Sequence, residues 1–178
     1  MIKMNAIQLL KTQLQSAHYT QEQTIAGVLN KNLHFAQTGK ALPVGAAYAH
    51  SVIGEDVCVS TMLENKTPLS AKKNAETGLS KPMPSFSEWD KHEQWTKTVK
   101  IDLPKLQKFA KKVYKATEDY IDTLKEKDLD REFDLTSMGA GKQNLAFVLN
   151  NFIILHIANL TGEISAAKGF QDLKGYPF

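Results

Sequence analysis

The chain has 178 residues, of which 42% are hydrophobic and 23% are charged, a composition typical of a globular protein. Its net charge of +3 is spread along the sequence, which argues against a nucleic-acid-binding protein. The single cysteine, Cys58, excludes a disulfide within the chain. This length suits one domain, so we treat residues 1–178 as a single folding unit.

The amino-terminal segment MIKMNAIQLLKTQLQ lacks the continuous apolar stretch and the small-residue cleavage site of a secretory signal. The longest apolar run, FIILHIANL, is much shorter than the roughly 20 residues that cross a bilayer. We therefore expect a cytoplasmic protein that does not act at a membrane.

Apolar residues recur every three to four positions from about residue 5 to 28 and predict one continuous amphipathic helix. After the break QTGKALP, Pro43 opens a second predicted helix, which runs from about residue 44 to Leu63. The next segment, NKTPLSAKKNAETGLSKPMP, is polar and contains three prolines and a glycine. It predicts a long connection, and connections of this length often carry binding functions.

Ser85 and Glu88 have the spacing of a capping box and predict a short helix that carries Trp89, His92 and Trp95. These three rings could line a pocket. Docking of the short helix through its apolar side is the simpler interpretation.

Asp102, followed by Pro104, is a candidate N-cap for a third long helix that ends at about Lys127. The segment DLDREFDLTSMGAGK predicts a second connection with a glycine-containing turn. The fourth predicted helix, from about Lys142 to Lys168, is the most apolar segment. No strand-like alternation is evident, so the sequence predicts an all-α fold, a four-helix bundle with long connections and a short extra helix.

Two histidines lie on apolar faces of different predicted helices. His50 shares a face of the second helix with Ile53, Gly54, Val57 and Cys58, and His156 shares a face of the fourth with Phe152, Asn159, Leu160 and Glu163. Inward-facing histidines on different helices are how helical bundles build internal metal sites.

The residue spacing argues against a complete metal site at His50 and His156. Histidines at positions i and i+4 direct both imidazoles to one point, but the residue four positions after His156 is Leu160. Glu163 and Glu55 are candidate carboxylate ligands that could equally be structural. From spacing alone, two buried core histidines remain the simpler interpretation.

The remaining candidates have structural interpretations. Cys58 lies two turns from His50 and could be a nucleophile, but a buried structural cysteine is the simpler hypothesis. His18 and His34 have no identifiable partner in the sequence, and we expect both to be surface or structural residues.

Three segments together resemble a known family. They are LPVGAAYAHSVIGEDV, FSEWDKHEQWTKTVKIDLPKLQKFAKKVYKATEDYIDTL and NNFIILHIANLTGEISAAKGFQDLKGYPF. The chain, from about residue 5 to its end, resembles the DinB-like (YfiT-like) superfamily, whose fourth helix carries the pattern H-x-x-x-H-x-G-E-I. His50 matches the metal ligand on helix two and His156 the first histidine of the pair on helix four. Gly162 and Glu163 match the rest of the motif, whereas Leu160 replaces the second histidine.

The resemblance implies a four-helix bundle, often dimeric, in which three histidines hold a divalent metal such as nickel or zinc. The family that the chain resembles includes metal-dependent thiol S-transferases, hydrolases and members without an assigned activity. With Leu160 at the third ligand position, we expect weak or absent metal binding and a non-catalytic or small-molecule-binding protein. The alternative is a transferase or hydrolase that uses His50 and His156. A homodimer and a small-molecule or thiol ligand are the expected partners.

Overall fold

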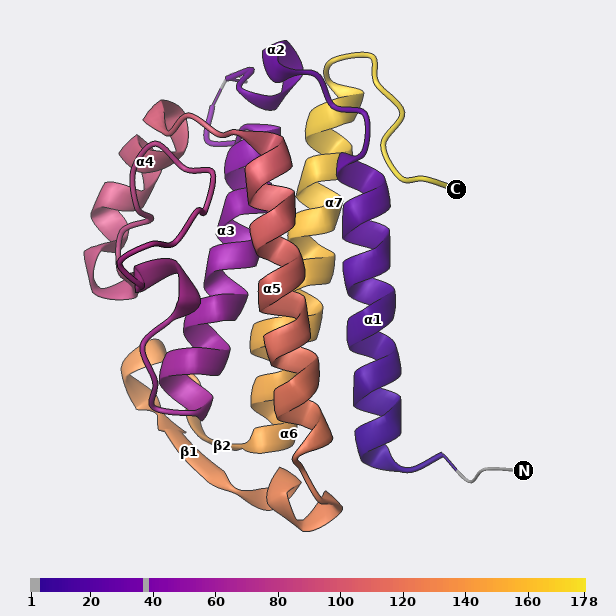
Figure 1. Ribbon diagram of the computed structural model, residues 1–178, viewed down its shortest axis with the longest axis vertical. Coiled ribbons are helices and arrows are strands. Elements are labelled where there is room, and N and C mark those ends of the chain that lie inside the picture. The colour runs from indigo at the N-terminus through magenta and orange to yellow at the C-terminus, as the bar shows by residue number, and fades with distance from the viewer. Residues whose placement is uncertain (1–3, 37–38) are drawn as a thin grey trace.

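Four long helical segments lie side by side in the computed structural model, which describes residues 4–36 and 39–178 (Figure 1). Helices α1 (Ala6–Ile25) and α5 (Leu103–Asp122) are each continuous. Helix α3 (Val44–Val57) continues into the π-helical turn η1 (Cys58–Leu63). The fourth segment consists of α6 (Leu145–Phe147), the π-helical η6 (Val148–Ile154) and α7 (Leu155–Gly169). The predicted all-α fold class is confirmed.

The long connection between α3 and α5 lets these two consecutive long helices run in the same direction. Helices α1 and α7 run one way and α3 and α5 the other, so the chain from α3 must cross the length of the molecule before α5 begins (Figure 1). This crossing segment contains η2 (Leu69–Ala71), η3 (Phe86–Lys91) and α4 (His92–Thr98), and it packs on the outer side of α3. The expected short helix is present, although Trp89 has a side chain outside the described part.

The beginning of the connection is bound to the last turn of α3. The carboxylate of Asp56 accepts hydrogen bonds from the backbone N–H groups of Leu69 and Ser70, at 2.9 and 2.8 Å. Farther along, Trp95 is buried and its indole N–H donates to the carbonyl of Lys81 at 3.3 Å. The Asp56 bonds anchor the connection to α3, and the Trp95 bond joins α4 to an earlier part of the same connection.

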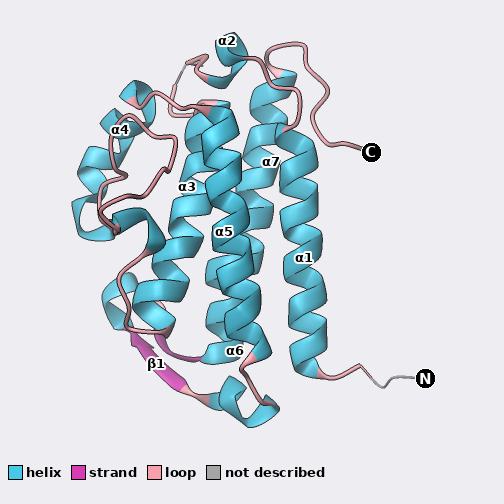
Figure 2. Cartoon of the chain, in the orientation of Figure 1, coloured by secondary structure: helices cyan, strands magenta, loops and turns pink. Residues whose placement is uncertain are grey.

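The expectation of no strands is wrong for residues 132–144. Strands β1 (Glu132–Leu135) and β2 (Gly141–Asn144) form an antiparallel hairpin, with Glu132 opposite Asn144 (Figure 2). Gly139 and Gly141 have positive φ angles of 77° and 65°, which let the chain reverse between the strands. The fourth helical segment consequently begins at Leu145 rather than near Lys142.

Helix ends follow local chemistry. The Asn5 side chain accepts from the Gln8 N–H in a capping box at the start of α1, and Asp102 caps α5 as predicted.

α1 ends at Ile25, earlier than predicted, where Gly27 turns the chain with φ 72°. The short helix α2 (Asn30–Leu33) follows and was not predicted. α5 also ends earlier than predicted, and η4 (Glu126–Asp130) and η5 (Thr136–Met138) occupy the second connection.

The segment Leu145–Gly169 is long and apolar enough to cross a membrane by length and composition, and 44% of its most apolar window is buried inside the protein. A core helix passes the same test, and Leu149, Ile153, Ile157 and Ile164 all pack against the other helices.

This packing generates a stability prediction for α7. Ile157→Ala removes a fully buried side chain and should lower the free energy of unfolding by about 2–5 kcal/mol, through lost burial and an unfilled cavity. Leu155→Ala, on the same helix at a 43% exposed position, should cost much less. Urea unfolding of both variants measures the difference. Equal costs would contradict the packing of α7 described above.

Candidate functional site

Three histidines from three helices form a hydrogen-bonded chain inside the molecule. His50 Nδ1 lies 2.7 Å from His92 Nε2, and His50 Nε2 lies 3.1 Å from His156 Nε2. His50 is central, with His92 from α4 on one side and His156 from α7 on the other. The structure therefore brings together the two histidines singled out in the sequence and adds a third.

Burial keeps this chain uncharged. His50 and His92 are 6% and 5% exposed. Burial, with smaller contributions from His156 and His92, lowers the pKa of His50 to about 3. Burial likewise lowers the pKa values of His92 and His156. The three imidazoles are thus neutral near pH 7, and neutral imidazole is the form that binds metals.

Gly54 makes room for His156. A Cβ atom at position 54 would lie 3.3 Å from Cε1 of His156, a tighter contact than most side chains accept. The absence of a side chain at this position lets the α7 imidazole approach α3 closely enough to reach His50.

The histidines do not surround a single point. His50 meets its two neighbours with different ring nitrogens, and no group of three histidine, cysteine, aspartate or glutamate side chains in the described ranges could hold a metal ion together. His50 Nε2 and His156 Nε2 face each other at 3.1 Å, within hydrogen-bond distance, as His50 Nδ1 and His92 Nε2 do at 2.7 Å. Leu160, at the position of the missing histidine, is buried in the apolar core.

Neither candidate carboxylate belongs to this chain of histidines. Glu163 is exposed, two helical turns beyond His156. Glu55 is 1% exposed, but its carboxylate lies 2.9 Å from His18 Nε2 and accepts a 2.5 Å hydrogen bond from the Thr117 hydroxyl. The Glu55 carboxylate is therefore already paired with a side chain of α1 and hydrogen-bonded to one of α5.

His18, expected to be a surface or structural residue without an identifiable partner in the sequence, is a buried structural residue with a partner. Its ring is buried, pairs with Glu55 and stacks on Tyr114 with ring centroids 3.7 Å apart. The Nδ1 atom of His18 is buried without a hydrogen-bond partner in the part of the chain that is described. His18 therefore joins α1 to α3 and α5 through one buried pair.

A further set of buried polar groups lies on the same side of α3. The hydroxyls of Tyr48 and Tyr114 donate to the Glu22 carboxylate at 2.5 and 2.8 Å, and the Gln21 amide donates to Ser51 at 2.7 Å. Burial is the largest cause that raises the pKa values of both tyrosines, so both remain protonated donors. These bonds tie α1, α3 and α5 together.

Cys58 is buried, and burial raises the pKa of its thiol to about 12. A thiol with that pKa carries almost no thiolate near neutral pH, and the thiolate is the reactive form. This arrangement favours the structural interpretation over a nucleophile.

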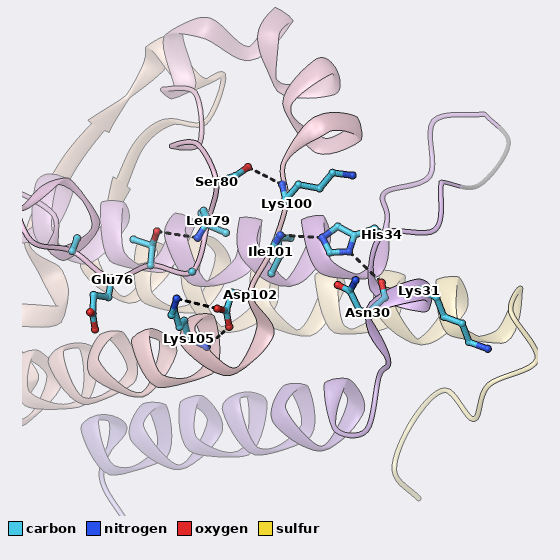
Figure 3. A pocket seen from close by; sticks show the side chains of 13 residues that line it. Asn30, Lys31, His34, Glu76, Leu79, Ser80, Lys100, Ile101, Asp102 and Lys105 are labelled. Atoms are coloured by element: carbon cyan, nitrogen blue, oxygen red, sulfur yellow. Dashed lines mark hydrogen bonds and ion pairs between the residues drawn. The ribbon is translucent and has the colours of Figure 1, made fainter.

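His34 has a structural position that links α2 to the start of α5. Its Nδ1–H donates to the Asn30 carbonyl at 3.2 Å, and its Nε2 accepts from the Ile101 N–H at 2.9 Å. His34 also lines a surface cavity of about 880 Å³, drawn in Figure 3.

The charges in that cavity do not converge on one point. Asp102 and Lys105 form an ion pair of 3.1 Å at one end, and Lys31 lies at the other (Figure 3). The cavity is built from residues 30–34, 75–80 and 100–105, away from the three histidines, and we assign no chemistry to it.

Removal of the two candidate carboxylates, Glu55 and Glu163, should have very different effects on the free energy of unfolding. Glu55→Ala leaves buried His18 without its partner and should lower the free energy of unfolding by about 3–5 kcal/mol. Glu163→Ala, at an exposed position, should change it by about 0.5 kcal/mol or less. Chemical denaturation of both variants provides the comparison. A negligible cost for Glu55→Ala would show that the buried pair does not stabilise the fold.

The lowered histidine pKa values predict acid sensitivity. The folded protein keeps His50 neutral down to about pH 3, whereas the unfolded chain takes up a proton near its ordinary pKa of 6.5. Stability should therefore fall as the pH drops from about 6.5 towards 3, by up to about 1.4 kcal/mol per pH unit for each such histidine. Unfolding of metal-stripped protein across this range tests the slope, and His50→Gln should show a shallower one. A flat profile would contradict a buried neutral His50.

Comparisons with known proteins support the fold and leave the site unassigned. No protein-family model and no curated protein matches the sequence. In fold, the chain is similar to a crystal structure described as the conserved protein of locus from Enterococcus faecalis. The TM-score is 0.73 and the identity 18%, over 94% of this chain and 99% of that chain. A likeness at this identity shows a shared helical fold and nothing about activity.

Proposed function

We propose that this protein is a DinB-like metal-binding protein that holds a divalent ion such as nickel or zinc between His50 and His156. The observation that carries the proposal is the 3.1 Å separation of their Nε2 atoms inside the protein. It agrees with the resemblance in sequence, which pairs these two positions across helices α3 and α7.

The donor atoms suit a metal. Imidazole nitrogens lie about 2.0–2.1 Å from Zn²⁺, so two of them on one ion are about 2.8–3.4 Å apart for ligand angles between square and tetrahedral. The observed separation lies within that range. Both histidines have lowered pKa values, so both rings are neutral near pH 7. One of the two Nε2 atoms carries the proton of their hydrogen bond, and that ring would have to move its proton to Nδ1 before both Nε2 atoms could bind one ion.

Two protein nitrogens leave further positions on the ion for small ligands. Because Glu55 is committed to His18 and Leu160 has no donor atom, water or a small-molecule thiol would have to occupy those positions. When bound, such an ion acts as a Lewis acid and lowers the pKa of a coordinated thiol or water. The proposal therefore favours small-molecule or thiol binding at a weak metal site. Transferase or hydrolase activity is the second candidate, based on these open positions.

Metal uptake tests the proposal directly. The unmodified protein should bind up to one nickel or zinc ion per chain, and His50→Ala and His156→Ala should each abolish that binding because a single imidazole remains. His34→Ala removes a histidine outside the proposed site and is the matched control. Equilibrium dialysis followed by elemental mass spectrometry gives the stoichiometry. Uptake by the unmodified protein no greater than by His50→Ala would overturn the proposal.

Leu160→His supplies the missing ligand of the family pattern. It should tighten metal binding at least tenfold, because histidines four residues apart on a helix direct their nitrogens to one point. Without metal it should destabilise the fold by about 1–3 kcal/mol, the usual cost of a poorly satisfied buried polar group. Thermal melts with and without nickel measure both effects. Unchanged affinity in a folded variant would show that position 160 does not face the site.

A further inference from the structure

One side of the molecule, formed by α1 and the fourth helical segment, carries almost no charge. The chain has 22 lysine and arginine residues and 19 aspartate and glutamate residues, yet none of them lies between residues 12 and 21, and only Glu163 lies between residues 143 and 167. Lys11, just before the first stretch, pairs with Asp122 at 2.7 Å and is thereby held on the α5 side of α1. Solvated protein surfaces normally carry lysine, arginine and acidic side chains, so this side is unusual.

Large apolar side chains project from this side, which we call the α1–α7 face. Its exposed residues include Leu9, Thr12, Ser16, Tyr19, Leu155 and Ala158. Tyr19 is 64% exposed, Leu9 46% and Leu155 43%. Tyr176, which follows α7, is 40% exposed, and its hydroxyl lies 3.2 Å from the point that a Cβ of Gly162 would occupy. Loss of charge together with exposed aromatic and apolar side chains is typical of the centre of a protein–protein interface.

A groove of about 390 Å³ runs along this face between α1 and the fourth segment. No charged residue is among the described residues that line it. Small side chains, including Thr12 and Ser16, form its α1 wall, and Ile154 and Ala158 belong to the opposite wall. Tyr19 projects beside the groove, since it lies one helical turn after Ser16. The face therefore combines a shallow apolar depression with projecting apolar side chains.

This combination fits a second copy of the same chain. Because the groove and the projecting side chains share one face, a twofold rotation can place the side chains of each copy over the groove of the other, as in a symmetric dimer. An uncharged face also meets its own copy without like-charge repulsion. The exposed side of α5, in contrast, carries Lys108, Lys111 and Lys112 and would repel its own copy.

The size of the face is sufficient for a weak dimer. α1 has 20 residues and is therefore about 30 Å long. It lies beside α7 (Figure 1), and two neighbouring helices with their side chains are about 20 Å wide. These dimensions give about 600 Å² per copy and about 1,200 Å² in total, the lower limit of the roughly 1,200–2,000 Å² that specific interfaces bury.

We propose that the α1–α7 face is the interface of a symmetric homodimer, in which Leu9 and Tyr19 of each copy cover the groove of its partner. The interface is separate from the proposed metal site, because His156 points to the other side of α7, towards His50 on α3. The contact is uncharged, so its dissociation constant should change little with salt concentration.

The test adds a charge to the face at positions where the fold tolerates it. Gln13→Arg and Ala158→Arg each introduce a cation at an exposed residue that lines the groove. Gln94→Arg makes the same change as the first variant at an exposed position of α4 and is the matched control. Analytical ultracentrifugation from about 1 to about 200 µM, at low and high salt, gives the dissociation constants. Circular dichroism establishes that each variant is folded.

We expect the unmodified protein and Gln94→Arg to dimerise equally, with dissociation constants that change less than about threefold with salt. Gln13→Arg and Ala158→Arg should each weaken the dimer at least about tenfold, because every added charge occurs twice in a symmetric dimer. A monomer over the whole concentration range overturns the proposal. A dimer that both variants leave intact also overturns it, since the copies then meet elsewhere. A monomer that binds vesicles of uncharged lipid, with binding lost in both variants, would identify a lipid surface as the occupant instead.

Discussion

Helix α3 is buried on every side, and the rest of the structure is arranged around the polar groups that it carries into the interior. All residues from Val44 to Asp56 are buried. A buried polar side chain without a partner costs more than a hydrogen bond contributes, so each one on α3 needs a donor or acceptor from another element. Partners come from α1, α4, α5, α7 and the long connection.

These partners divide between two sets that differ in chemistry. Towards α1 and α5, Tyr48, Ser51 and Glu55 meet a carboxylate, an amide, hydroxyls and the ring of His18, and the contacts join helices far apart in the sequence. Towards α4 and α7, His50 meets only other imidazoles among the contacts described above. The first set has the composition of a structural network. The second consists of groups whose nitrogens can exchange a proton for a metal ion, and it is where we place the function.

Periodicity was sufficient to predict the helices but not the contacts between them. The four long segments follow from apolar spacing, whereas the hairpin was missed because EFDL and GKQN are short, half-polar strands whose pairing depends on two glycines in the turn. The surface and structural alternatives were left open for His18, although it lies four residues after Leu14 and seven before Ile25, on the same inward stripe. That spacing was the signal that could have identified it as buried.

His92 could not have been found from spacing, because its contact with His50 joins two segments 42 residues apart through the docking of α4. The sequence offered only an indirect signal: a histidine three residues before a tryptophan at the start of a short helix. The pairing of His50 with His156 was predictable, since it depends on inward faces of two long helices and a family pattern. The replacement at Leu160 was visible for the same reason, and its consequence for metal binding stays a prediction.

The most direct test of the account is anomalous X-ray diffraction from crystals soaked in nickel, recorded at the nickel absorption edge. The account predicts one strong anomalous peak about 2.1 Å from the Nε2 atoms of both His50 and His156, with His92 still hydrogen-bonded to His50 Nδ1. A peak bound elsewhere, or no peak while the two Nε2 atoms remain hydrogen-bonded to each other, would contradict it.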